Sequence, residues 1–134
     1  MRLLSTLTIC CLALSFCKKQ EDPVKRTFTG NLPIAQTNTP LTATAGQDIR
    51  TNVRCQLPSI NGSIFFEGFD IQETTPRTYA ISAKALYKDW TQIGIDVLWN
   101  LDTVATVRTT TPGMYVLQFY NENKLFKSDT VQVN

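Results

Sequence analysis

The amino-acid sequence predicts an all-β fold, a β-sandwich of about seven antiparallel strands that follows a short N-terminal segment. Short runs rich in Val, Ile, Phe, Tyr and Thr recur about every ten residues, separated by Pro, Gly or Asn. Apolar and polar residues alternate within these runs, as in strands with one buried and one solvated face. No stretch is purely helical in its period, because even Ala80–Trp90, the best candidate, also alternates as a strand does.

Two strands are expected in the first part of the domain. Phe28–Ala35 is expected at the edge of a sheet, because Pro33 lacks the N–H that a central strand needs. Asp48–Leu57 has the clearest alternation, and Ala45–Asp48 forms the turn that leads into it. The side chains expected to share its buried face are Ile49, Thr51, Val53, Cys55 and Leu57.

The next two expected strands are Ser63–Ile71, which follows an Asn61–Gly62 turn, and Arg77–Tyr87. Strict alternation in the first of them puts Phe65, Phe69 and Ile71 on one face, and Ile64 and Phe66 on the other. The second is expected to present one continuous apolar face made of Tyr79, Ile81, Ala83, Ala85 and Tyr87.

A further strand is expected over Ile93–Leu101, and its alternation directs Trp99 into the core. The short run Val104–Arg108 either continues this strand or crosses to the other sheet.

The last two strands form a hairpin. Met114–Tyr120 places Tyr115, Leu117 and Phe119 on one face, and Asn121–Asn123 forms the turn. The pattern of the returning strand, Leu125–Val133, conflicts with itself, because Lys127 and Asp129 share a face with Val131 and Val133. A β-bulge near Lys127–Asp129 would resolve this conflict.

The segment Thr111–Leu117 places Tyr115 at the start of the sixth strand, and Asp129–Asn134 reads as a closing strand. From Phe28 to Asn134 the chain therefore resembles the immunoglobulin-like sandwich domains of bacterial surface proteins, with Tyr115 as the tyrosine corner. In the antibody pattern a cysteine would stand where this chain has Leu117. Cys55 is therefore expected to be a small buried apolar residue, the alternative being a reactive thiol.

The N-terminal segment reads as an export signal. One cation, Arg2, precedes a short apolar run from Leu3 to Phe16, which is too short to span a membrane. The ending Leu14-Ser15-Phe16-Cys17 resembles the lipobox of bacterial lipoproteins, although Phe16 stands where that family usually has a small residue. The resemblance implies a signal helix over residues 1–16 and a diacylated Cys17 that anchors the mature chain. The alternative is an ordinary secretory signal without lipid.

Residues 17–27 are expected to form a flexible tether, followed by the domain over residues 28–134. The charged run Lys18–Asp22 is similar to the tether of surface-exported lipoproteins of the Bacteroidota. It implies the outer membrane as the location, with display at the cell surface as the further expectation.

The composition excludes several classes of function. Histidine is absent, which removes the commonest general base and zinc ligand. Lys and Arg number 13 against 11 Asp and Glu, so no basic face for nucleic acid is expected. Only Cys55 follows Cys17, so the mature chain has neither an internal disulfide nor a cysteine metal site, and no cofactor is expected.

The acidic residues suggest no catalytic pair. Glu67, Asp70 and Glu73 lie close in sequence, and Asp96 and Asp102 follow later. On a strand Glu67 and Asp70 take opposite faces, whereas a glycosidase needs two carboxylates that converge across a cleft. Solvated faces are favoured for them, and no calcium-type loop is present.

The aromatic residues are the better candidates for binding. Trp90, with Tyr87 close by, sits where an expected strand runs into a loop, and such a pair can stack on a sugar ring or anchor a protein. Phe66 and Tyr120, expected to face away from the core, would extend an apolar patch.

The sequence therefore predicts a lipid-anchored, non-enzymatic domain that binds a protein or glycan partner through the strand ends near Trp90 or through an open sheet edge. Two alternatives remain open: a structural subunit or spacer of an envelope complex, and a glycan hydrolase that uses carboxylates alone. The sequence gives no oligomeric state.

Overall fold

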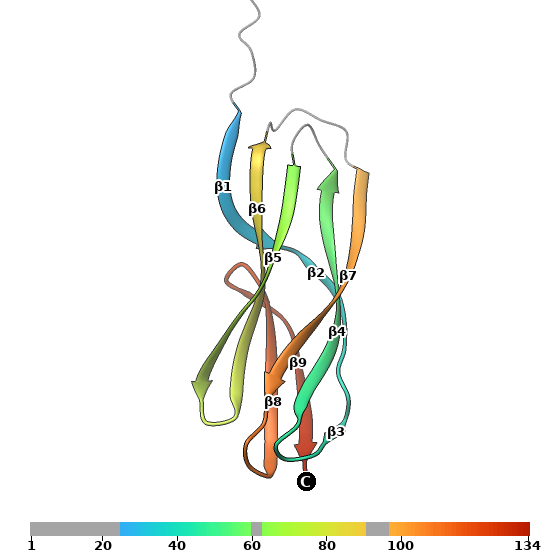
Figure 1. Ribbon diagram of the computed structural model, residues 1–134, viewed down its shortest axis with the longest axis vertical. Helices are drawn as coiled ribbons and strands as arrows, with labels where there is room; N and C mark the ends of the chain where they lie inside the picture. The colour runs from blue at the N-terminus through green and yellow to red at the C-terminus, as the bar shows by residue number, and fades with distance from the viewer. Residues whose placement is uncertain (1–24, 60–62, 91–96) are drawn as a thin grey trace, which may run out of the picture.

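The computed structural model describes residues 25–59, 63–90 and 97–134, and within them the chain is all-β, with two sheets packed face to face (Figure 1). None of the described residues forms a helix long and apolar enough to cross a membrane. The nine strands are β1 Arg26–Leu32, β2 Ile34–Asn38, β3 Thr42–Ala43, β4 Asp48–Ser59, β5 Ser63–Thr75, β6 Thr78–Trp90, β7 Val97–Arg108, β8 Gly113–Asn121 and β9 Lys124–Val133.

The expected sandwich is confirmed, and the described residues form nine strands in place of about seven. The larger sheet has the order β1-β6-β8-β9-β3, with β5 on the other side of β6, and the smaller sheet has the order β2-β4-β7. Two pairs are parallel, β3 with β9 and β6 with β8, where antiparallel pairing was expected throughout. In the β5–β6 hairpin it is β6 that also pairs with β8, and these two strands run in the same direction.

The expected edge strand Phe28–Ala35 is divided at Pro33. Before it, β1 pairs with β6 in the larger sheet, and after it β2 pairs with β4 in the smaller sheet. Proline has no N–H with which to continue the β1 ladder, so the chain crosses between sheets at this point. The Asn121 side chain fixes the crossing: its Oδ1 accepts from Ile34 N–H at 2.6 Å, and its Nδ2 donates to Ile34 O at 3.1 Å.

The core between the sheets is built by the alternating residues that the sequence indicates. On β4 the inward series is confirmed, with Leu57 only partly buried, and Cys55 is fully buried. On β6 and β8 the expected inward residues are also buried, apart from a partly exposed Tyr79. The run Val104–Arg108 continues the strand as part of β7, whereas residues 93–96 lie outside the described residues.

A bulge in β5 overturns the expected division of its faces. The pairing with β6 shifts between Phe66 and Gly68, and Gly68 has a positive φ of 111°, which glycine adopts without strain. The extra residue reverses the alternation, so that Phe66 and Phe69 both pack against the core while Phe65 is 53% exposed. Phe66 therefore does not belong to an outer apolar patch.

The conflict in β9 is also resolved differently from the expectation. The bulge lies earlier, with Phe126 as the extra residue between Leu125, which pairs with Tyr120, and Lys127, which pairs with Phe119. Asp129 therefore stays on the inward face with Val131, and its side chain is only 14% exposed.

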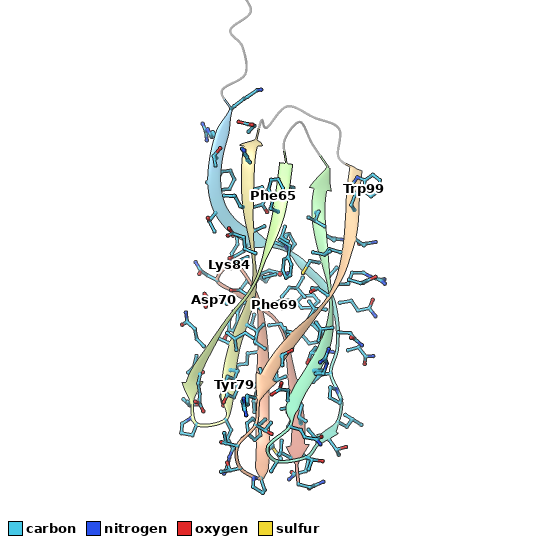
Figure 2. All side chains as sticks on the ribbon, viewed as in Figure 1. Phe65, Phe69, Asp70, Tyr79, Lys84 and Trp99 are labelled. Atoms are coloured by element: carbon cyan, nitrogen blue, oxygen red, sulfur yellow. The ribbon has the colours of Figure 1, made fainter. Side chains whose placement is uncertain are left out.

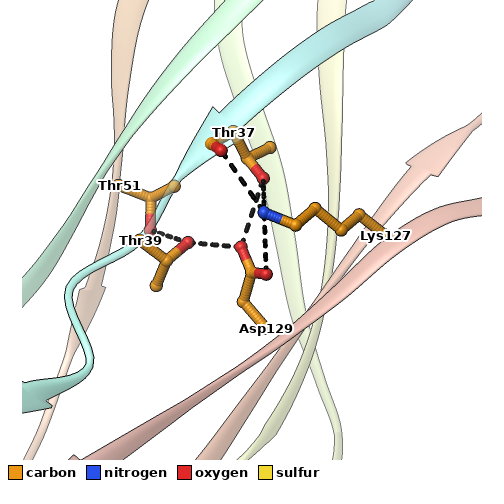
Figure 3. Close-up of polar contacts among 5 residues, drawn as sticks. All are labelled: Thr37, Thr39, Thr51, Lys127 and Asp129. Atoms are coloured by element: carbon orange, nitrogen blue, oxygen red, sulfur yellow. Dashed lines mark hydrogen bonds and ion pairs between the residues drawn. The ribbon is translucent and has the colours of Figure 1, made fainter.

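A polar cluster accommodates Asp129 between the sheets (Figure 3). One carboxylate oxygen accepts hydrogen bonds from the hydroxyls of Thr39, at 2.6 Å, and Thr37, at 3.1 Å. Lys127 Nζ lies 3.0 Å from the other oxygen and also donates to the Thr37 carbonyl at 3.3 Å. The buried Thr51 hydroxyl donates to Thr39 Oγ1 at 3.1 Å, so the cluster joins β9 of the larger sheet to β2 and β4 of the smaller one. We call these five residues the Asp129 cluster.

The tyrosine corner is formed as the resemblance implies. The buried Tyr115 hydroxyl donates to the Thr111 carbonyl at 3.1 Å, four residues upstream. Next to it, the buried Thr109 hydroxyl lies 2.6 Å from the Gln47 carbonyl, which ties the end of β7 to the turn before β4.

We predict that the stability of the fold depends on the charge of Asp129. Burial raises the pKa of this carboxyl, but hydrogen bonds from Thr39 and Lys127 and the charge of Lys127 outweigh that effect, so the folded-state pKa lies below its ordinary value. The stabilisation is therefore complete above the unfolded-state pKa and is lost as the pH falls through the folded-state pKa. Urea unfolding at a series of acidic pH values measures it.

Near neutral pH, Asp129→Asn should lower the free energy of unfolding by about 1–3 kcal/mol, and this difference should shrink as the pH falls. Asp102→Asn is the matched control, because Asp102 is paired with Arg54 on the surface, where solvent screens the pair and it contributes little to stability. If the free energies of unfolding of the Asp129 variant and the parent differed by the same amount at every pH, the stabilising role of the Asp129 charge would be contradicted.

Candidate functional site

The structure describes only some of the residues that the sequence singles out for anchoring and binding. Cys17 lies outside the described residues, and so does the Trp90 side chain, although the Trp90 backbone pairs with Arg26 at the end of β6. Tyr87 is 6% exposed and stacks on Phe28 with ring centroids 4.8 Å apart, while its hydroxyl donates to Asn31 O at 3.1 Å. The expectation that Tyr87 offers a contact surface beside Trp90 is therefore wrong, because its ring is part of the core.

Trp99 was expected in the core and is 64% exposed instead. It points to the inward side of β7, but it pairs with Leu57, beyond Cys55, the last residue of β4 that pairs with β2. The smaller sheet is only two strands wide at this level, and Trp99 lies near the upper end of β7 (Figure 2). Alternation gave the direction of this side chain but not the width of the sheet.

The acidic candidates are dispersed, and the described residues hold no group of three possible metal ligands. Asp102 forms a two-point contact with Arg54, at 2.7 and 3.2 Å, and the hydrogen bond from Arg54 lowers the pKa of Asp102. Asp70 lies 3.7 Å from Lys84 Nζ, and Glu73 accepts from the Arg77 N–H at 2.8 Å. Glu67 is exposed, and Asp96 lies outside the described residues.

Two long strands have a side without a partner among the described residues: β5 pairs only with β6, and β7 pairs only with β4. The edge of β5 carries the Gly68 bulge and the acids Glu67, Asp70 and Glu73, and such features protect natural edges from further pairing. By contrast, β7 pairs with β4 over twelve successive residues without a shift, and it contains neither Pro nor Gly.

The free side of β7, which we call the β7 edge, lies beside incompletely covered apolar side chains. The cluster around Asp129 places β2 next to β9, so β7 lies at the side of the smaller sheet that is nearest to β6 and β5. In Figure 1 the lower ends of β5 and β6 lie to the left of the lower end of β7. Their inward side chains Phe69, Ile71 and Tyr79 pack against the core but are only partly buried (Figure 2).

Two open hollows lie on the outer faces. The first, about 400 Å³, is on the smaller sheet and is lined by amides and the Arg54–Asp102 pair, together with Thr103, Val53 and Val104. The second, about 390 Å³, is on the larger sheet and includes Tyr120, Asp70 and Lys84. The outward position of Tyr120 agrees with the sequence, but no sequence signal indicates that it lines a hollow.

The chain matches no protein-family model, no curated protein and no solved structure. The candidates for function are therefore defined by geometry: the β7 edge, the two hollows and the exposed Trp99.

We predict that Cys55 is inert in the folded protein. Burial raises the pKa of its thiol to about 11, and the thiolate is the reactive form. Alkylation of the mature protein with iodoacetamide, mapped by mass spectrometry, should leave Cys55 unmodified under native conditions and modify it fully in urea. Rapid native labelling would instead support the reactive-thiol alternative.

Proposed function

We propose that the chain is a lipid-anchored, non-catalytic domain of the cell envelope that binds a protein partner by strand addition at the β7 edge. The observation that carries the proposal is a twelve-residue edge of regular register and β-rich sequence, next to apolar side chains that the smaller sheet leaves partly uncovered. The proposed partner presents one extended segment, with alternate apolar side chains on the face that turns inward.

The character of the edge supports this choice. Native proteins shorten, bulge or charge their free edges, because a flat edge with unpaired N–H and C=O groups pairs with other chains. The edge of β5 is protected in this way, whereas β7 has Asp102 as its one acid and Arg108 at its end, and exposes Trp99 and Val104.

The partly covered side chains indicate how the partner segment contributes. A strand added beside β7 would extend the smaller sheet over Phe69, Ile71 and Tyr79. Main-chain hydrogen bonds would supply affinity, and burial of these side chains would add about 25 cal/mol for each Å² of apolar surface removed from water. A lipid on Cys17 would raise the effective concentration of the domain near envelope partners.

A synthetic peptide tests the β7 edge directly. We expect a ten-residue peptide that alternates Val with Thr or Lys to bind the mature protein, and a peptide of the same composition with its valines in one block not to bind. Successive N–H groups of a strand point to opposite sides, so the bound peptide should slow hydrogen exchange by ~10-fold at every second amide of β7. NMR-detected exchange reads out this pattern.

Thr103→Pro and Val104→Pro serve as paired variants. The two neighbouring N–H groups point to opposite sides of β7, so only one of them points to the free side. Proline at that position leaves the hydrogen bonds to β4 in place, so this variant should fold normally and lose the protection by the peptide. Trp90→Ala is the control for the strand-end alternative and should bind as the parent does. The β7 proposal is overturned if peptide protection persists in the folded proline variant or maps to other strands.

The anchor is tested separately. We expect mass spectrometry of the mature N-terminus to find an acylated Cys17, and protease treatment of whole cells to remove the domain. Cys17→Ala should release the protein from the membrane fraction, because no lipid remains to hold it. An unmodified Cys17 in a protein that washes freely from cells would contradict this part of the proposal.

A further inference from the structure

The hollow on the larger sheet arises from a fork in the sheet. One side of β6 pairs with β8 over Thr78–Ile81 and then with β1 over Ala83–Trp90. Because β1 and β8 separate at this point, an opening of about 390 Å³ remains between them, with β6 as part of its wall. Just beyond it, the Asn121 side chain at the end of β8 bonds to the backbone of Ile34, the first residue of β2, which follows β1 after Pro33. The opening is thus a built feature of the fold.

Polar groups of several kinds surround this opening. Asp70 and Gln72 come from β5, Ser82 and Lys84 from β6, and Asn31 from β1. The partly buried Tyr120 and the turn residues Glu122 and Asn123 also line it, and the remaining lining residues, Ala80 and Ile81, are apolar. Within the described part of the chain, the side chains of Asn31, Ser82 and Asn123 make no hydrogen bond, so their donors and acceptors are available to a ligand.

We propose that this fork hollow binds a neutral saccharide. An aromatic ring beside amide, hydroxyl and carboxylate groups suits a sugar, whose C–H face packs on the ring and whose hydroxyls both donate and accept. The volume lies within the range of ~300–1,000 Å³ that is usual for small-molecule sites. This site is separate from the β7 edge and does not depend on it.

The charges of the lining select against acidic sugars. Two carboxylates, Asp70 and Glu122, face one ammonium, Lys84, so an anionic ligand would meet a net negative charge. The hollow on the smaller sheet is a natural comparison, because it has nearly the same volume and also combines amides with an acid–base pair, but it contains no aromatic ring. We expect no saccharide binding there.

The test uses the mature protein, labelled with ¹⁵N, and four defined hexasaccharides. Maltohexaose, cellohexaose and chitohexaose are neutral, and hexagalacturonate is anionic. At least one neutral oligosaccharide, added at up to ~10 mM, should shift the amide resonances of Ser82, Lys84 and Tyr120, which allows detection of a dissociation constant near ~1 mM. Hexagalacturonate should bind more weakly than that neutral oligosaccharide.

Tyr120→Ala should weaken the binding at least tenfold, which is about 1.4 kcal/mol. Asp70→Asn, which keeps the shape of the side chain, is the second variant and should also weaken it. Asp102→Asn, in the hollow without an aromatic ring, and the folded β7 proline variant should bind as the parent does. The inference is overturned if no neutral oligosaccharide shifts these resonances, if hexagalacturonate binds most tightly, or if neither Tyr120→Ala nor Asp70→Asn changes the affinity.

Discussion

The packing of the two sheets depends on a charged group placed between them. Asp129 stands on the inward face of β9 next to Val131, where an unpaired carboxylate would carry a large desolvation cost. Its stability there requires the hydroxyls of Thr37 and Thr39 and the ammonium of Lys127, all of which it contacts. These contacts are satisfied only when β2 lies beside β9, so the cluster also sets the side on which β7 is left without a neighbour.

Where apolar and polar residues alternate without interruption, the sequence alone predicted which side chains are buried. Tyr115 forms its corner, and Cys55 is buried on the face that alternation predicts. The errors have two physical origins: the number of strands that cover a side chain is a property of the whole sheet, and a bulge exchanges the two faces of a strand. Trp99 points inward beyond the end of β2, and Gly68 reverses the faces of β5 through a positive φ that alternation does not reveal.

The candidate sites were even less accessible from sequence, because they arise where strands far apart in the chain fail to meet. The fork hollow exists because β6 changes partner from β8 to β1, and Tyr120 reaches it from the far end of β8. β7 has a free side because it is the last strand in the order of the smaller sheet, β2-β4-β7, and no other strand among the described residues pairs with it. No residue type along β7 announces that a neighbour is missing, so only the topology identifies this edge.

The proposed anchor bears on the choice between the strand ends and the β7 edge. Arg26, where β1 begins, pairs with Trp90, so the chain enters the domain at the end where Trp90 lies. Eight residues lie between Cys17 and Arg26, so the nine steps of the backbone that join these two residues span at most ~32 Å when fully extended. A lipid on Cys17 would therefore hold the Trp90 end close to the membrane. The β7 edge runs along the length of the sandwich (Figure 1), so most of it would remain open to a partner approaching from the side.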